Sequence, residues 1–172
     1  MKTLTNIKSI NSLRASCLTL LAAVTLVFAP QPATAKDQVP FRADFNTVFE
    51  STLNFPFISV HVTGDGEATH LGRTAIETTD QVGNVLTGAT TATYHLTAAN
   101  GDEVVVEFYF LALPTQTGFT FAGTWEITGG TGRFTNASGS GTIEGRADFT
   151  SATGGVGQFT MIGTISSPGS LQ

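Results

Sequence analysis

The sequence is poor in cross-linking and helix-forming residues. Its one cysteine, Cys17, lies in an N-terminal segment that we expect to be removed, so the rest of the chain offers no disulfide, thiol nucleophile or cysteine metal site. Long helix-forming side chains are scarce, and no stretch repeats apolar residues at helical spacing for more than one turn. A domain with these absences must be held together by burial and backbone pairing, which favours a closed β structure.

Basic residues are also few, and three of them (Lys2, Lys8 and Arg14) precede an apolar run from Ala15 to Ala29. The run is shorter than the roughly 20 residues of a membrane-spanning helix, and the small residues Ala33-Thr34-Ala35 follow it. This order is typical of a secretory signal peptide. We therefore expect residues 1–35 to be cleaved off, a secreted or periplasmic location, and no membrane span in the mature protein. An uncleaved membrane anchor is the alternative.

The mature chain is acidic. Five basic residues remain against thirteen acidic ones, so the formal charge of residues 36–172 is −8, compared with −5 for the whole chain. A surface of this sign repels phosphate backbones, and we expect no nucleic-acid partner. The length of residues 36–172 suits one domain with a single core, and we expect a loose C-terminal tail from about Ser166.

Alternating apolar and polar residues indicate strands rather than helices. Eight are expected, over residues 41–50, 57–63, 67–78, 90–97, 103–111, 119–127, 142–149 and 158–165. We expect Gly64-Asp65-Gly66 to end the second strand, a loop at Val82-Gly83-Asn84, and a type I′ turn at Asn100-Gly101. Glycines on the apolar faces of the last three strands permit the strong coiling that barrel closure requires.

These features predict an all-β fold, an eight-stranded antiparallel up-and-down barrel. The interior of such a barrel is just wide enough to be filled by side chains or to hold one small ligand. If it holds a ligand, we expect Phe108, Phe110, Phe121 and Trp125 to line the site, because they lie on the apolar strand faces.

The ionisable candidates are His70, Glu107 and Tyr109. His70 precedes Gly72 and either supports a turn through the backbone, which we favour, or acts as an acid or base in a pocket. Glu107 and Tyr109 share one strand face; in an apolar pocket the carboxyl would have a raised pKa and act as a general acid, whereas on the outer face it is merely solvated, which we favour. His61 and His95 fall on polar faces, so we expect no metal site.

The most distinctive segment runs from Gly129 to Gly141 and reads GGTGRFTNASGSG. Strand patterns flank it on both sides, and it lacks the Lys-Ser/Thr and the helix of a phosphate loop, so we exclude a nucleotide site. We interpret it as a structural corner made by Gly129, Gly130, Gly132, Arg133 and Phe134. Arg133 is expected to bind carbonyl groups or a carboxylate near the barrel rim.

This corner resembles the Gly-Gly-Thr-Gly-Lys/Arg-Phe…Ala-x-Gly corner of dirigent proteins, and its context is similar to the allene oxide cyclase barrel. Small secreted bacterial proteins of uncharacterised function carry a similar corner and a segment like Gly66 to Gly72. The resemblance implies an eight-stranded antiparallel barrel with a largely apolar cavity and no cofactor, often assembled as trimers. Because only the corner aligns, it supplies no catalytic residues.

Two functions follow from this pattern. The first is a secreted barrel that binds a small apolar ligand or serves as an envelope or interaction domain, and it is our prediction because no catalytic set can be assembled. The second is a cofactor-free isomerase or cyclase of the allene oxide cyclase or dirigent kind. Ionisable groups that converge in a cavity would favour the enzyme, an apolar lining would favour binding, and a filled interior would exclude a ligand altogether.

Overall fold

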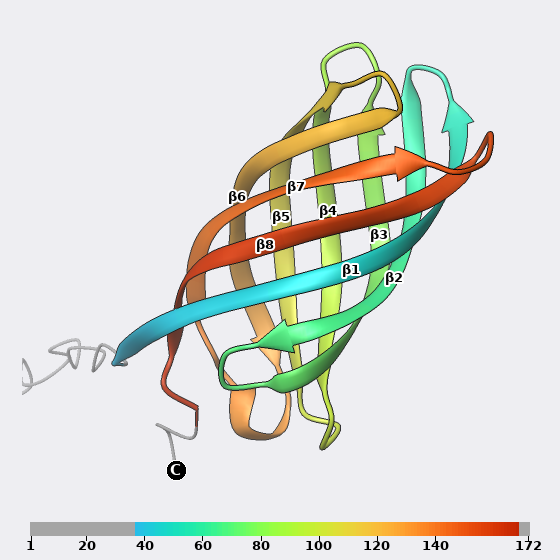
Figure 1. Ribbon diagram of the computed structural model, residues 1–172. Coiled ribbons are helices and arrows are strands. Elements are labelled where there is room, and N and C mark those ends of the chain that lie inside the picture. Colours follow the sequence, from blue (N-terminus) through green and yellow to red (C-terminus); the bar gives the residue numbers. More distant parts are fainter. Residues whose placement is uncertain (1–36, 169–172) are drawn as a thin grey trace, which may run out of the picture. The chain divides into compact units, whose positions relative to one another are not determined.

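The computed structural model describes residues 37–168, so the expected signal peptide lies outside the described residues. Eight strands close into a barrel, each antiparallel to its neighbours in sequence, and β1 pairs with β8 to complete it (Figure 1). The prediction of an eight-stranded antiparallel up-and-down barrel is confirmed. The strands are β1 (Gln38–Asn54), β2 (Phe57–Ala68), β3 (Gly72–Asn84), β4 (Ala89–Ala98), β5 (Glu103–Pro114), β6 (Gly118–Gly130), β7 (Gly139–Phe149) and β8 (Gly154–Ser166).

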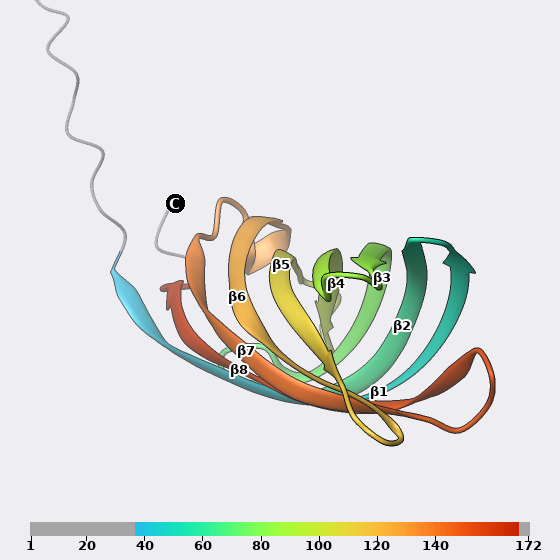
Figure 2. The ribbon, with the colours of Figure 1, turned by 90° about the horizontal axis from the view of Figure 1, so that it is seen from above.

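Alternation along each strand decides which side chains enter the barrel. In β1, residues 41, 43, 45, 47 and 49 are buried, while the residues between them are exposed. Successive side chains of a strand point to opposite faces of the sheet, so one apolar face suffices to build a core. Figure 1 shows β1, β7 and β8 wrapping obliquely across the more upright β3, β4 and β5, and Figure 2 shows the two groups of strands on opposite sides of the barrel.

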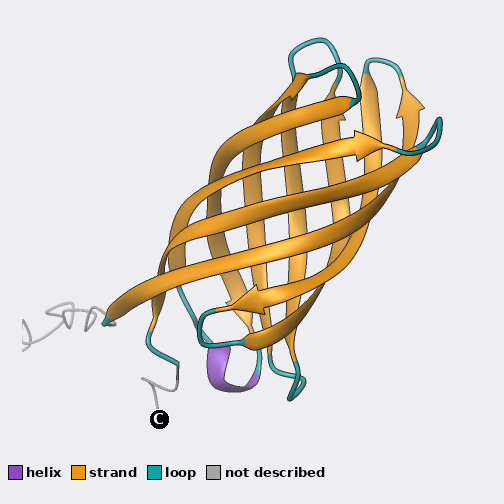
Figure 3. Ribbon diagram, in the orientation of Figure 1, coloured by secondary structure: helices purple, strands orange, loops and turns teal. Residues whose placement is uncertain are grey.

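The two ends of the barrel differ. One end, called the closed end below, carries the connections β2–β3, β4–β5 and β6–β7, and the last of these includes the short 3-10 helix η1 (Gly132–Phe134) (Figure 3). Side chains that are fully buried fill this half, among them Trp125, Phe134, Leu96, Ile165 and Val104. Phe41 packs edge-on against Trp125 with ring centroids 5.4 Å apart, and the Trp125 indole donates to the Thr142 carbonyl at 3.0 Å.

The opposite end, called the open end, carries the connections β1–β2, β3–β4, β5–β6 and β7–β8. These span residues 55–56, 85–88, 115–117 and 150–153, and none of them contains a charged side chain. Within residues 37–168 there is no helix long and apolar enough to cross a bilayer.

Two turn predictions at the start of the barrel are wrong. Gly64 and Gly66 lie inside β2. A Cβ on either residue would come within 2.9 Å of a Cα atom of β1, so these glycines allow the two strands to approach closely and do not form a turn. The turn itself falls at residues 69–71, where His70 takes a φ of 70°. Val82-Gly83-Asn84 likewise belongs to β3, and the loop follows it at residues 85–88.

The Asn100-Gly101 turn is also not of type I′. Gly101 has a φ of 86°, whereas Asn100 is not in the positive-φ region. The Gly101 N–H donates to the Ala98 carbonyl and the Ala98 N–H to the Asp102 carbonyl, each at 2.9 Å. This is a three-residue hairpin loop that needs one left-handed residue, and glycine supplies it.

A β-bulge at Thr79 changes the parity of β3. Thr78 pairs with Tyr94 and Asp80 with Thr93, so Thr79 is the extra residue. Ile76 and Thr78 point inward before the bulge, and Gln81 and Gly83 point inward after it. The Thr78 hydroxyl accepts the Val62 N–H at 2.8 Å where the ladder is interrupted. Without the bulge, Asp80 rather than Gln81 would face the interior.

The end of β8 is tied to the corner. Ser166 is buried, its N–H donates to the Ser138 carbonyl at 2.7 Å, and its hydroxyl accepts the Ser138 N–H at 3.1 Å. Ser166 is therefore still part of the paired structure, and residues 169–172 of the expected loose tail lie outside the described residues.

Candidate functional site

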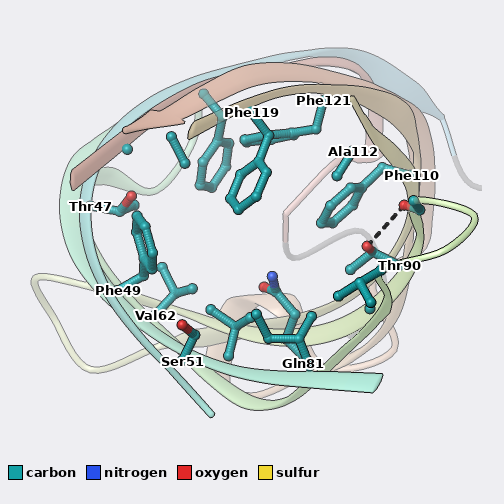
Figure 4. Close-up of a pocket in the computed structure, with 18 of the residues that line it drawn as sticks. Thr47, Phe49, Ser51, Val62, Gln81, Thr90, Phe110, Ala112, Phe119 and Phe121 are labelled. Atoms are coloured by element: carbon teal, nitrogen blue, oxygen red, sulfur yellow. Dashed lines mark hydrogen bonds between the residues drawn. The ribbon is translucent and has the colours of Figure 1, made fainter. Parts of the chain in front are cut away.

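The open half of the barrel contains a cavity of about 210 Å³ that opens between the four uncharged connections. All eight strands contribute to it, through the second halves of β1, β3, β5 and β7 and the first halves of their successors (Figure 4). The lining side chains are aromatic, aliphatic or neutral and polar: Thr47, Phe49, Ser51, Ile58, Val60, Val62, Gln81, Asn84, Val85, Thr90, Tyr94, Phe110, Ala112, Pro114, Phe119, Phe121, Ala147, Phe149 and Phe159. Glycines 83, 88 and 157 complete the lining.

Aromatic rings form one wall and the floor of the cavity. Phe149 lies between Phe49 and Phe119, with ring centroids at 5.4 and 5.3 Å. At the floor, Phe159 contacts Tyr94 and Phe121 at 6.1 and 6.4 Å. Edge-to-face and tilted contacts of this kind stabilise aromatic clusters. The rings separate the cavity from the packed half of the barrel.

The mouth of the cavity is apolar as well. Phe55 and Leu86 are 71% and 69% exposed on adjoining connections, and Leu53, Phe57 and Leu113 are also exposed around the rim. A single exposed apolar side chain is ordinary, but several around one opening indicate a surface suited to apolar molecules.

Polar groups inside the cavity are few and specifically placed. The Tyr94 hydroxyl donates to the Gln81 amide oxygen at 2.9 Å. Burial raises the pKa of Tyr94 above its ordinary value, so the hydroxyl stays protonated at neutral pH. The Ser51 and Thr90 hydroxyls donate to the carbonyls of Thr153 and Gly88 at 2.8 and 3.2 Å.

The four aromatic residues expected to line a ligand site divide into two pairs. Phe110 and Phe121 line the cavity, and their rings lie 5.1 Å apart (Figure 4). Phe108 and Trp125 point inward too, but they lie in the packed half and do not border the cavity. Strand parity places all four inside the barrel, but it does not reveal which end is open.

The ionisable candidates lie away from the cavity. Glu107 and Tyr109 are on the outer face of β5, where the Tyr109 hydroxyl donates to the Glu107 carboxylate at 2.7 Å and 51% of Tyr109 is exposed. That hydrogen bond raises the pKa of Tyr109. His70 sits in the β2–β3 turn at the closed end, with its Nε2 3.3 Å from the Pro40 carbonyl oxygen.

The other two histidines lie on the outer surface and do not converge with His70. The His61 Nε2 atom lies 3.8 Å from the Glu77 carboxylate, and the His95 Nδ1 atom lies 2.9 Å from the Glu103 carboxylate. Among residues 37–168 there is no group of three His, Cys, Asp or Glu side chains that could hold a metal ion.

The glycine-rich corner lies at the closed end and connects three turns there. The Arg133 guanidinium contacts the Asp102 carboxylate in the β4–β5 turn at 2.9 Å and the His70 carbonyl in the β2–β3 turn at 3.5 Å. Phe134, the next residue, is fully buried in the barrel. The corner therefore holds the three turns of the closed end together, and it lies at the opposite end of the barrel from the cavity.

Replacing Gly132 with Val should destabilise the barrel more than replacing Gly101 with Val. Both glycines have positive φ, so valine is strained at either position by about 1–2 kcal/mol. A Cβ at Gly132 would also overlap the Asp102 carboxylate, whereas a Cβ at Gly101 meets open space. We expect Gly132→Val to lower the free energy of unfolding by about 2–4 kcal/mol in total, as measured by urea unfolding. Equal losses would show that the Asp102 contact plays no part.

The Asp102–Arg133 contact should make stability depend on pH in the acid range. Hydrogen bonds from Asn100 and Arg133 hold the pKa of Asp102 below its ordinary value of 3.8. A lowered carboxyl pKa stabilises the folded state above the unfolded-state pKa, and the contribution is lost as pH falls through the folded-state value. Thermal unfolding should therefore show an advantage of the wild type over Asp102→Asn at pH 6 that shrinks as the pH falls below 3.8 and disappears once the folded-state carboxyl is protonated. A constant difference across this range would contradict the assignment.

Sequence reasoning missed the polar residues of the cavity. Tyr94 could have been found, because it alternates with His95 and shares the face of Leu96. Gln81 could not, because no glycine or proline marks the bulge at Thr79 that turns it inward.

The fold and the site together define a small antiparallel barrel that is packed at one end and has an apolar cavity at the other. No protein-family model matches the chain, and no curated protein matches it. A solved structure of a pterocarpan synthase dirigent protein is similar, with a TM-score of 0.49 and 11% sequence identity over 80% of this chain and 91% of that one.

Proposed function

We propose that this protein is a secreted barrel that binds one small, uncharged, largely apolar molecule in the cavity at its open end. The observation that carries the proposal is the lining: among the described residues that border the cavity none carries a charge, and an apolar rim leads into it. Transfer of a charged ligand into such a site would cost far more than transfer of a neutral one, because no opposite charge compensates the lost hydration.

The dimensions of the cavity limit the size of the ligand. A volume of about 210 Å³ is below the roughly 300–1,000 Å³ of sites for drug-sized molecules. The cavity therefore suits a compound with one ring or a short chain. The flat faces of Phe110, Phe119 and Phe121 favour an aromatic or unsaturated one.

Secretion is part of the proposal. It is supported by the basic start, the apolar run from Ala15 to Ala29 and the small residues Ala33-Thr34-Ala35. Assembly as a trimer is an expectation from the resemblance to dirigent barrels, and the subunit count of the purified protein tests it.

The alternative, an isomerase or cyclase, would need groups that exchange protons with a bound ligand. Of the candidates, Glu107 and Tyr109 lie on the outer face and His70 lies at the closed end. Tyr94 is the cavity-lining residue with an ionisable side chain, and its pKa is raised. No observation of the site favours this alternative over binding.

NMR titration with small neutral aromatics, toluene and acetophenone, tests the proposed function. We expect shifts of the methyl signals of Ile58, Val60 and Val62, which border the cavity, and not of Val104 and Ile165, which are buried at the closed end. The closed-end methyl groups are an internal control for non-specific effects. If neither compound shifts the cavity methyl groups, the proposed function is wrong.

A further inference from the structure

Gln81 is a long polar side chain in a cavity walled mostly by rings and aliphatic groups. The bulge at Thr79 turns it inward, and Figure 4 shows its amide pointing into the cavity, across from Phe119 and Phe121. Bulges commonly re-aim a side chain next to a functional site. The same bulge turns Asp80 outward, so the cavity wall carries the neutral Gln81 side chain where it would otherwise carry the charged Asp80 side chain.

Tyr94 fixes the orientation of this amide. The Tyr94 ring is held in place by Phe108 and Phe159, with centroids at 4.9 and 6.1 Å. Its buried hydroxyl must donate its proton, and the acceptor is the Gln81 amide oxygen at 2.9 Å. With the oxygen engaged, the amide nitrogen is the group left to face the cavity, and it makes no hydrogen bond among residues 37–168.

The other polar groups of the cavity contribute less donor capacity. The Ser51 and Thr90 hydroxyls already donate to backbone carbonyls. The Asn84 amide lies at the mouth, where its oxygen accepts the Leu86 N–H at 2.9 Å, so its nitrogen is a second amide donor, placed at the rim rather than in the interior. The Thr47 side chain also points into the cavity, beside Phe49, and its hydroxyl can donate a hydrogen bond there (Figure 4).

We propose that the cavity selects neutral ligands that carry a carbonyl-type oxygen, a ketone, aldehyde, ester or lactone, which accepts a hydrogen bond from the Gln81 amide N–H. This inference rests on the proposed function and specifies its ligand class. A hydrocarbon of the same shape would displace water from the amide and leave its donors unpaired, which is costly in an apolar site. A carboxylate would satisfy the donor but would bring an unpaired charge among the rings.

Three one-ring probes with equal numbers of non-hydrogen atoms test this class. Acetophenone carries the carbonyl, α-methylstyrene replaces it with a methylene group of the same shape, and benzoate replaces the methyl ketone with a carboxylate. Affinities are measured by calorimetry or NMR titration for the wild type, Gln81→Leu and the control Gln158→Leu, whose glutamine is exposed on the outer face of β8.

We expect the wild type and Gln158→Leu to bind acetophenone about tenfold more tightly than α-methylstyrene, the effect of one satisfied buried donor, and to bind benzoate least. Gln81→Leu should remove the preference by weakening acetophenone alone. Equal affinities of the wild type for acetophenone and α-methylstyrene would overturn this inference and leave the proposed function intact. A preference that persists in Gln81→Leu would overturn it too, whereas failure of every neutral probe to bind would refute the proposed function itself.

Discussion

Phe134→Ala should lower the free energy of unfolding by about 3–5 kcal/mol, the range found when a fully buried aromatic side chain is truncated in a packed core. Phe134 projects from η1 into the closed end and is 0% exposed. The N–H groups of Phe134 and Ala137 bind the carbonyls of Thr131 and Phe134, at 2.9 and 2.8 Å. This fixed backbone cannot collapse into the space that the ring would leave, so the full cost of a cavity is expected.

Phe119→Ala is the matched control, because its ring borders the cavity rather than the packed half. Phe119 is only partly buried, and we expect its truncation to cost about 1–2 kcal/mol. Urea unfolding of both variants measures the difference between the two ends of the barrel. Similar losses would mean that the open half is packed as tightly as the closed half and leaves no room for a ligand.

Ala112→Phe should abolish ligand binding without unfolding the barrel. Ala112 lies on β5 with its side chain directed into the cavity (Figure 4), so a phenyl ring there would occupy the space that the ligand needs. The ring would replace empty volume with apolar contacts, and we expect stability to be unchanged or slightly raised.

The matched control for this change is Ala122→Phe. Ala122 is exposed on the outer face of β6, where it pairs with Leu111, so the same ring is added outside the barrel. Titration with acetophenone should show wild-type affinity for Ala122→Phe and none for Ala112→Phe. Wild-type affinity in both variants would place the ligand somewhere other than this cavity.

The inward face of the last three strands and the glycine-rich corner were the more predictable features of the molecule. Alternation in β6 to β8 correctly separates inward from outward side chains, because the period of a strand is a local property. The glycine-rich corner was likewise visible, since strand patterns surround it on both sides. Its partners, Asp102 and the His70 carbonyl, were not, because they come from turns that only the closed barrel brings together.

The site was less predictable, for two physical reasons. Whether an inward ring borders a cavity or a core depends on which rings of the other strands meet it, and this separates Phe110 and Phe121 from Phe108 and Trp125. In addition, the bulge at Thr79 reverses the parity of the rest of β3. Continuing the alternation from Thr78 places Asp80 inside the barrel and Gln81 outside it.

The positions of the turns were also difficult to predict from the sequence. Gly64-Asp65-Gly66 has the composition of a turn, yet it runs through β2, because close approach to β1 also requires glycine. The neighbouring turn instead uses His70 in a left-handed conformation, which histidine adopts far less often than glycine.

The most direct test of ligand binding at the open end is native mass spectrometry of the protein purified from its own source. We predict a mass increase that corresponds to one small neutral molecule per chain, lost on unfolding and missing from Ala112→Phe produced in the same way. Wild-type protein without such a molecule, or an equal mass increase in Ala112→Phe, would contradict the claim that the cavity at the open end is a ligand-binding site.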